Sequence, residues 1–178
     1  MWPRTDFLEL LGIIHPIVQA PMSGFTPPAL VTAVCNAGGL GSIGCVGQPP
    51  DVVREQVAAV RQATNRPFNL NFFVHRSPQT DPEATARMRA KLAPYFDEYG
   101  LRPVPEPNEP FSTFDAEQLD LVLELRPRVV SFHFGLPETA AVRRLKGAGC
   151  IILSSATTVA EARWLEANGA DVIIAPGI

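Results

Sequence analysis

Short apolar runs alternate with longer amphipathic stretches along most of this chain. In the longer stretches, apolar residues recur at the spacing of a helix face, as at Val53, Val57 and Val60. The short runs lack the alternation of a half-exposed strand, which is typical of strands in a parallel sheet covered by helices. Six such runs are present: 17–20, 41–43, 68–72, 129–132, 151–154 and 172–175. This order predicts an α/β fold, either a doubly wound open sheet or a (β/α)8 barrel.

Glycines mark the joins between helix-like stretches and strands. Gly38, Gly149 and Gly169 each precede one of the apolar runs. A glycine just past a helix end supplies the left-handed backbone that satisfies the last carbonyls. The last two joins lie about one helix plus one strand apart, as a repeating βα unit requires. Two helix starts have the spacing of a capping box: Asp115 with Gln118, and Thr158 with Glu161.

The segment between His75 and Thr113 breaks this alternation. It begins with a helix predicted from Pro82 to about Tyr99, in which Pro94 marks a kink or a stop. Residues 102–110 contain too many prolines for a helix or a central strand. We therefore expect a single α/β domain over residues 1–178, with a helical and proline-rich insertion at about 75–114. Such insertions often cover active sites, and a surface decoration without a role fits the pattern equally well.

Composition and charge indicate which binding partners and which cellular compartment to expect. The 178 residues have a net charge of −3 and scattered Lys and Arg residues, which argues against binding to nucleic acid or to an anionic membrane. No apolar run approaches a membrane span, and the first residues lack the apolar stretch of a signal peptide, so we expect a cytoplasmic protein. Three cysteines without CxxC spacing predict neither a disulfide framework nor a metal site.

Polar residues gather at the carboxyl ends of the predicted strands, where both candidate folds bind ligands. By the two-residue period of a strand, Asn69 and Asn71 share one face, and Ser131 and His133 share another. A lone histidine such as His133 is more often a satisfied core residue than a site residue, and Asn71 either binds a ligand or links neighbouring strands. Met22 fits plain core packing as well as a site. The sequence contains no HExxH, P-loop, GxSxG or GxGxxG motif.

Five ordered motifs resemble the nitronate monooxygenases, formerly called 2-nitropropane dioxygenases. The motifs are residues 16–24, 33–44, 67–73, 130–137 and 155–162. The resemblance implies a TIM barrel that binds FMN at its strand ends and oxidises alkyl nitronates with molecular oxygen. It also implies that Ala20, Pro21, Met22 and Asn71 bind the flavin and that His133 lies in the substrate pocket. The cofactor would supply the chemistry, and the protein would supply orientation and a dry site.

One departure from the family pattern concerns the segment after the sixth run. Members of the family continue there with a Gln-Gly pair and then Glu-Ala-Gly-Gly-His, whose histidine acts as the base for neutral nitroalkanes. Here the sequence reads Ala175-Pro176-Gly177-Ile178. We therefore expect an incomplete TIM (β/α)8 barrel, a truncated form with about six βα units and without the units that hold phosphate. Nitronates are already anionic and need no base, so their oxidation remains the expected function, with weakened FMN binding.

Two alternatives remain open from the sequence. The flavin-dependent enoyl-acyl-carrier-protein reductases resemble the same motifs and would oxidise NAD(P)H instead of consuming oxygen with nitronates. A non-catalytic remnant would survive by pairing with another chain, because an incomplete barrel leaves its first and sixth strands with open edges that favour self-association.

Overall fold

The computed structural model describes residues 5–76, 79, 81–106 and 113–176. The chain forms two compact units: a larger one, Met1–His75 with Ser112–Ile178, and a smaller one, Arg76–Phe111. Within the described residues, no helix is both long and apolar enough to cross a membrane.

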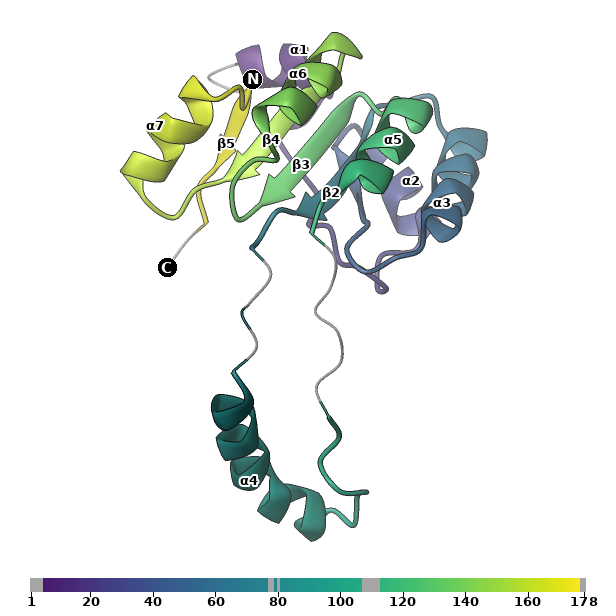
Figure 1. Ribbon diagram of the computed structural model, residues 1–178. Coiled ribbons are helices and arrows are strands. Elements are labelled where there is room, and N and C mark those ends of the chain that lie inside the picture. The colour runs from purple at the N-terminus through teal and green to yellow at the C-terminus, as the bar shows by residue number, and fades with distance from the viewer. Residues whose placement is uncertain (1–4, 77–78, 80, 107–112, 177–178) are drawn as a thin grey trace. The chain divides into compact units, whose positions relative to one another are not determined.

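The larger unit is built on a parallel sheet whose strands follow one another in chain order (Figure 1). Its strands are β1 Gly41–Gly44, β2 Phe68–Phe73, β3 Val129–His133, β4 Ile151–Ser155 and β5 Val172–Ile174. A doubly wound sheet reverses its strand order at a switch point, whereas a barrel keeps the order of the chain. The unbroken order therefore confirms a partial (β/α) barrel.

The first predicted strand is not a strand of this sheet. Residues 17–20 contribute only an isolated parallel bridge between Val18 and Leu40. The side chain of Gln19 accepts a hydrogen bond from the backbone N–H of Ser42 at 2.9 Å, so a side-chain oxygen takes the place of a main-chain carbonyl. The described structure thus has five strands and one bridge where the sequence predicts six strands.

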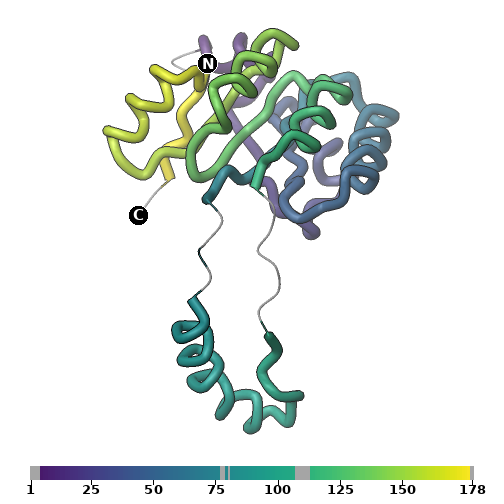
Figure 2. Tube along the Cα trace, in the orientation of Figure 1, coloured from purple at the N-terminus to yellow at the C-terminus, as the bar shows by residue number. Residues whose placement is uncertain are grey.

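Helices of the larger unit lie side by side along one face of the sheet (Figures 1 and 2). Prolines stand in the first turns of α2 and α3, and the side chain of Asp115 caps α5. Thr158 and Glu161 form the predicted capping box of α7. The bounds are α2 Pro28–Asn36, α3 Pro50–Ala63, α5 Ala116–Leu125, α6 Thr139–Gly147 and α7 Val159–Ala167.

The main hydrophobic core lies between these helices and the sheet. Strand residues such as Leu70 and Phe132 pack there with helix residues such as Val57 and Val122, all of them nearly inaccessible to solvent. Full burial of one such side chain contributes roughly 1.5–3 kcal/mol. The spacing of Val53, Val57 and Val60 therefore identified the buried stripe of α3 correctly.

The opposite face of the sheet, called the inner face here, is closed at the N-terminal ends of the strands by α1, Asp6–Leu11. Leu8 and Leu11 pack with Leu40, Val129 and Leu153 in a second core cluster. Helix α1 was not expected from the sequence. Its six residues contain too little periodicity, and the Thr5 side chain forms no capping bond.

The smaller unit consists of α4, Pro82–Glu98, and the segment that follows it. Asp81 caps the helix by accepting a hydrogen bond from the backbone N–H of Ala84. The predicted helix is confirmed, but Pro94 does not end it, because the helix continues to Glu98. Arg89 donates to the carbonyl of Val104 at 2.8 Å and ties the following segment to α4.

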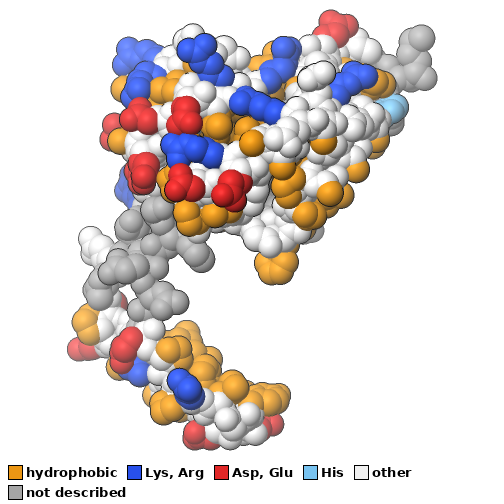
Figure 3. Space-filling model, turned by 90° about the vertical axis from the view of Figure 1, so that its right-hand side faces the viewer, with side chains coloured by type: hydrophobic (Ala, Val, Ile, Leu, Met, Phe, Trp, Pro, Cys, Tyr) orange, Lys and Arg blue, Asp and Glu red, His pale blue; other side chains and the backbone are white. Residues whose placement is uncertain are grey.

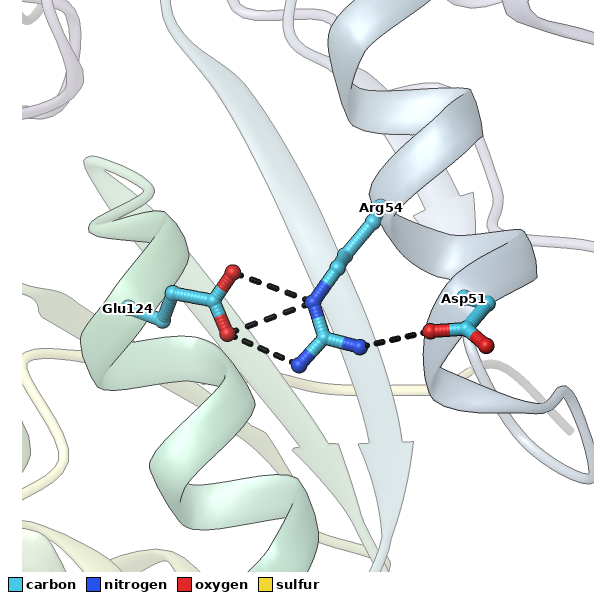
Figure 4. A network of polar contacts seen from close by, with 3 residues as sticks. All are labelled: Asp51, Arg54 and Glu124. Carbon is cyan, nitrogen blue, oxygen red and sulfur yellow. Dashed lines mark hydrogen bonds and ion pairs between the residues drawn. The ribbon is translucent and has the colours of Figure 1, made fainter.

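An exposed ion-pair network joins α3 and α5 on the surface (Figure 4). The Arg54 guanidinium donates to both carboxylate oxygens of Glu124 and, at 2.8 Å, to Asp51. Hydrogen bonds from Arg54 lower the pKa of Glu124. Because all three groups are exposed, water and salt screen the network, and it orients the two helices more than it stabilises them.

Candidate active site

The candidate site lies at the carboxyl ends of β3 and β4. His133 ends β3, and the chain then turns through Phe134 at φ 70° and Gly135 at φ 118°. A left-handed backbone is unfavourable for phenylalanine, and such strain is frequent at functional sites. The Ser154 hydroxyl holds the turn by donating to the carbonyl of Gly135 at 2.8 Å. The turn therefore leaves the Phe134 side chain 66% exposed beside His133.

The imidazole of His133 is oriented by its neighbour on β4. Its Nδ1 lies 2.8 Å from the Oγ of Ser155, while Nε2 has no hydrogen-bond partner among the described residues. The ring is half-buried, and this burial lowers the pKa of His133 below its usual value of 6.5. The side chain is therefore neutral near pH 7, with one nitrogen fixed and the other available.

A cavity of about 570 Å³ opens beside His133. Its walls are mostly apolar, and Glu161 is the acidic residue among them. The Glu161 carboxylate accepts hydrogen bonds from the backbone N–H and the hydroxyl of Thr157, which lower its pKa and keep it ionised. This leaves His133 as the titratable group free to act on a ligand. The lining residues are His133, Phe134, Gly135, Ser155, Thr157, Glu161, Trp164, Leu165, Ile174 and Pro176.

An aromatic cluster flanks the cavity at the ends of β2 and β3. The Phe73 ring centroid lies 5.7 Å from that of His133 and 5.0 Å from that of Phe134, both in edge-on contacts. His75 belongs to the same cluster, and its buried Nδ1 has no hydrogen-bond partner. Edge-on packing restrains the rings, so the cluster limits rotation of the His133 imidazole.

A buried polar network crosses the inner face one layer below. Ser131 Oγ accepts hydrogen bonds from Asn69 Nδ2 at 2.8 Å and from Asn71 Nδ2 at 2.9 Å, and Asn69 Nδ2 also donates to Ser42. Asn71 therefore links neighbouring strands, one of the two roles considered from the sequence. Asn69 Oδ1 is buried without a partner and leaves an unused acceptor in the barrel interior.

The segment with Ala20, Pro21 and Met22 lies against the end of β1. A Cβ atom added to Gly44 would lie 3.0 Å from the carbonyl carbon of Met22, so the two backbones are in close contact. Met22 is 44% exposed, which does not fit core packing. Gly44 pairs with Asn71 in the sheet. The structure thus brings the residues predicted to bind flavin to one edge, whereas the cavity lining includes only His133 of the predicted site residues.

Several participants were missed by sequence reasoning. Ser131, which joins the two asparagines, was expected to share a face with His133 but was not predicted as a site residue. Ser155, which orients His133, was not predicted as a site residue either. Trp164 forms part of the cavity wall from α7 and gave no signal beyond helical spacing. Among the described residues, no group of three His, Cys, Asp or Glu side chains is arranged to hold a metal ion.

Comparison of this sequence with models of protein families shows the family to which the chain belongs. Residues 4–178 match the family model of nitronate monooxygenase. This chain belongs to the nitronate monooxygenase family. The resemblance inferred from the five motifs is thereby confirmed.

Two curated relatives and two solved structures illustrate the relationship. The nitronate monooxygenases of Paraburkholderia phytofirmans and Pseudomonas aeruginosa are each 45% identical over 98% of this chain, which covers 48% and 50% of their lengths. The crystal structure of nitroalkane oxidase from Streptomyces ansochromogenes matches with a TM-score of 0.79 at 37% identity, over 97% of this chain and 48% of that chain. The structure of FabK from Thermotoga maritima matches with a TM-score of 0.71 at 29% identity, over 98% of this chain and 44% of that chain. The chain thus spans about half the length of the relatives it matches.

Proposed function

We propose that this chain contains the substrate-facing part of an FMN-dependent enzyme that oxidises alkyl nitronates with molecular oxygen. The observation that supports this function is the neutral His133 imidazole, fixed by Ser155 through Nδ1 and free at Nε2, in a mostly apolar cavity at the strand ends. An alkyl nitronate combines a small apolar chain with an anionic head, which fits one polar contact in an apolar cavity. Membership of the nitronate monooxygenase family agrees with this choice.

The inner face fits the ring system of a flavin. A flavin ring presents an N–H donor along one polar edge, and Asn69 Oδ1 is a buried acceptor without a partner. Ala20 and Met22 are exposed and Pro21 is partly buried, and their segment borders the same inner-face region through Gly44 and Asn71. We infer that Ala20, Pro21, Met22 and Asn71 hold the ring, as the family resemblance implies.

The described residues fit the phosphate of FMN less well. Phosphates bind at free helix N-termini in many nucleotide sites. Here the carboxylate of Asp115 accepts a hydrogen bond from the first turn of α5, and the carboxylate of Glu161 accepts from backbone N–H groups at the start of α7. Two helix starts are therefore already occupied by negative charge. The helices α2, α3 and α6 begin without a side-chain cap, but prolines without an N–H stand in the first turns of α2 and α3, and the acidic Glu138 precedes α6. Weak FMN binding by the 178-residue chain is the expected consequence.

FMN, held by Ala20, Pro21, Met22 and Asn71 as proposed above, would supply the redox chemistry that links nitronate oxidation to oxygen. His133 with its proton on Nε2 donates a hydrogen bond to a nitronate oxygen, while the Ser155 hydroxyl donates to Nδ1. The pKa lowered by burial keeps this imidazole from carrying its own charge. The apolar walls exclude water, which strengthens the single charge-assisted hydrogen bond.

The first experiment measures flavin binding and oxygen consumption on the purified chain. FMN fluorescence is titrated with protein, and an oxygen electrode then records turnover of an alkyl nitronate at saturating FMN. We expect nitronate-dependent oxygen uptake that falls about tenfold or more in His133→Asn, which removes the imidazole contact. His15→Asn is the matched control, because His15 is exposed beside the segment that leads to the 17–20 bridge.

The outcomes separate the proposed function from its alternatives. Oxidation of reduced nicotinamide with an enoyl thioester, without oxygen uptake on nitronates, would support the reductase. Failure to bind FMN at millimolar concentration would remove catalysis from this chain and favour a non-catalytic role. Equal activity of His133→Asn and His15→Asn would refute the assignment of His133. Light scattering on the same sample tests the proposed self-association through open sheet edges, which a stable monomer would contradict.

A further inference from the structure

A pocket lined by four arginines lies at the opposite end of the sheet from His133. It has a volume of about 340 Å³ and sits where β2 and β3 begin, at Phe68 and after Arg128. The arginines are Arg61, Arg66, Arg126 and Arg128, and none of the residues lining this pocket is acidic. Figure 3 shows Lys and Arg side chains gathered along the upper part of the larger unit, where the strands begin in Figure 1.

This concentration of positive charge contrasts with the rest of the chain. The whole sequence has a net charge of −3. Four arginines elsewhere are each paired with a carboxylate: Arg54, Arg87, Arg89 and Arg144. In the described residues, by contrast, none of the four pocket arginines forms an ion pair. The C-termini of α3 and α5 lie nearby and each contribute only about half a negative charge, which does not balance four guanidinium groups.

Two of the arginines are fixed in place. Arg128 donates to the carbonyl of Leu10 at 2.9 Å, and Arg61 donates to the carbonyl of Leu125 while its guanidinium lies 5.9 Å from the ring centroid of Phe68. A guanidinium has five N–H donors, so each retains most of its donors for a ligand. Fixed donors lose little conformational entropy on binding.

The other two arginines are free to close on a ligand. Neither Arg66 nor Arg126 has a side-chain hydrogen bond within the described residues, and both are exposed. Arg126 also occupies an unusual position, because it is the C-cap of α5 with φ 44° and ψ 58°. Glycine is the residue that this left-handed position favours. An arginine there tolerates backbone strain and places a guanidinium at the pocket.

We propose that this arginine pocket binds a small anion with phosphate groups, such as a pyrophosphate-bearing metabolite. Guanidinium groups match the oxygen geometry of phosphate with paired hydrogen bonds and stay charged at every physiological pH. The volume suits a small molecule. The pocket is separate from the proposed flavin site, which lies at the other end of the strands, so it serves a second ligand.

Isothermal titration calorimetry of the 178-residue chain with inorganic pyrophosphate tests the proposal. We expect saturable binding that weakens as sodium chloride is raised. The double variant Arg66→Gln with Arg126→Gln should lose about tenfold in affinity for each arginine removed. The matched control is Arg143→Gln with Arg163→Gln, which makes the same charge change at exposed positions of α6 and α7 outside the pocket.

Arg126→Gly separates ligand binding from a merely structural role. Glycine relieves the left-handed strain, so the thermal midpoint should stay constant or rise while pyrophosphate affinity falls. Unchanged affinity in this variant, equal loss in the control pair, or no saturable binding would each overturn the proposal. Binding of citrate in preference to pyrophosphate would overturn the assignment of phosphate chemistry. All of these readouts are independent of flavin binding and nitronate oxidation.

Discussion

Replacing Gly44 with alanine tests whether the 20–24 segment depends on its close contact with β1. An alanine Cβ would lie 2.6 Å from the backbone nitrogen of Ser23 and 2.9 Å from its Cα. Ordinary van der Waals contact begins at 3.4 Å, so the backbone nitrogen of Ser23 must move about 0.8 Å away from the new Cβ. The Ser23 hydroxyl donates to the carbonyl of Val46 at 2.6 Å, and this hydrogen bond resists the movement of Ser23.

The expected cost follows from this geometry. The clashing atoms belong to backbone, so no flexible side chain can move aside to accommodate the methyl group. Overpacking of this kind costs about 1–3 kcal/mol, which lowers the thermal midpoint by roughly 2–4 °C per kcal/mol in a chain of this size. The displaced Met22 backbone should also weaken FMN binding, if the proposed flavin site is correct.

Gly147→Ala is the matched control for this substitution. A Cβ at Gly147 meets nothing within 4 Å, and this glycine is the last residue of α6. Alanine there should be neutral or stabilise the helix by up to about 1 kcal/mol. Urea unfolding followed by circular dichroism compares both variants with the parent chain. Equal stability of Gly44→Ala and Gly147→Ala would refute the contact between the 20–24 segment and β1.

Three further predictions follow from buried groups. Ser131→Ala removes an acceptor shared by Asn69 and Asn71 and should cost about 2 kcal/mol in urea unfolding, and an unchanged midpoint would contradict the network. His133 has a lowered pKa, so its contribution to stability is present above pH 6.5 and lost as the pH falls; His133→Asn should flatten this loss, measured by unfolding at several pH values. All three cysteines are buried, and burial raises the pKa of Cys45 to about 12, so a thiol reagent should react only after unfolding.

Much of the fold was predictable because its signals are local. Gly38, Gly149 and Gly169 all adopt the positive φ that their places after helices predicted. The capping box of α7 likewise depends on residues three positions apart. The prediction of a strand at 17–20 was wrong because strand pairing depends on residues distant in the sequence. Here the backbone N–H of Ser42 donates to the side chain of Gln19 and not to a main-chain carbonyl. The pattern of apolar residues along the chain cannot reveal that a side chain takes the place of a backbone acceptor.

The sequence predicted which site residues share a face of a strand, but not which hydrogen-bond partners they have. The two-residue period placed Asn69 with Asn71 and Ser131 with His133 on common faces, and both pairs lie on the inner face. Which hydroxyl accepts from which amide depends on the register between strands, which aligns Asn71 with Ser131. The role of Ser155 depends on a second register, between β3 and β4, which pairs Phe132 with Ser154 and brings the end of β4 beside His133.

The inner face changes in polarity from one end of the strands to the other, and this gradient explains where ligand chemistry is possible. Toward the N-terminal ends of the strands, Leu40 and Val129 pack with Leu8 and Leu11 of α1 in an apolar cluster. The middle layer contains the Ser131 network, in which Asn69 Oδ1 remains unsatisfied. The top layer contains His133 with an unused Nε2 beside the cavity. A buried unpaired acceptor such as Asn69 Oδ1 costs about 1–3 kcal/mol, so a ligand that donates to it would stabilise the fold, while His133 Nε2 offers a second polar contact at the cavity.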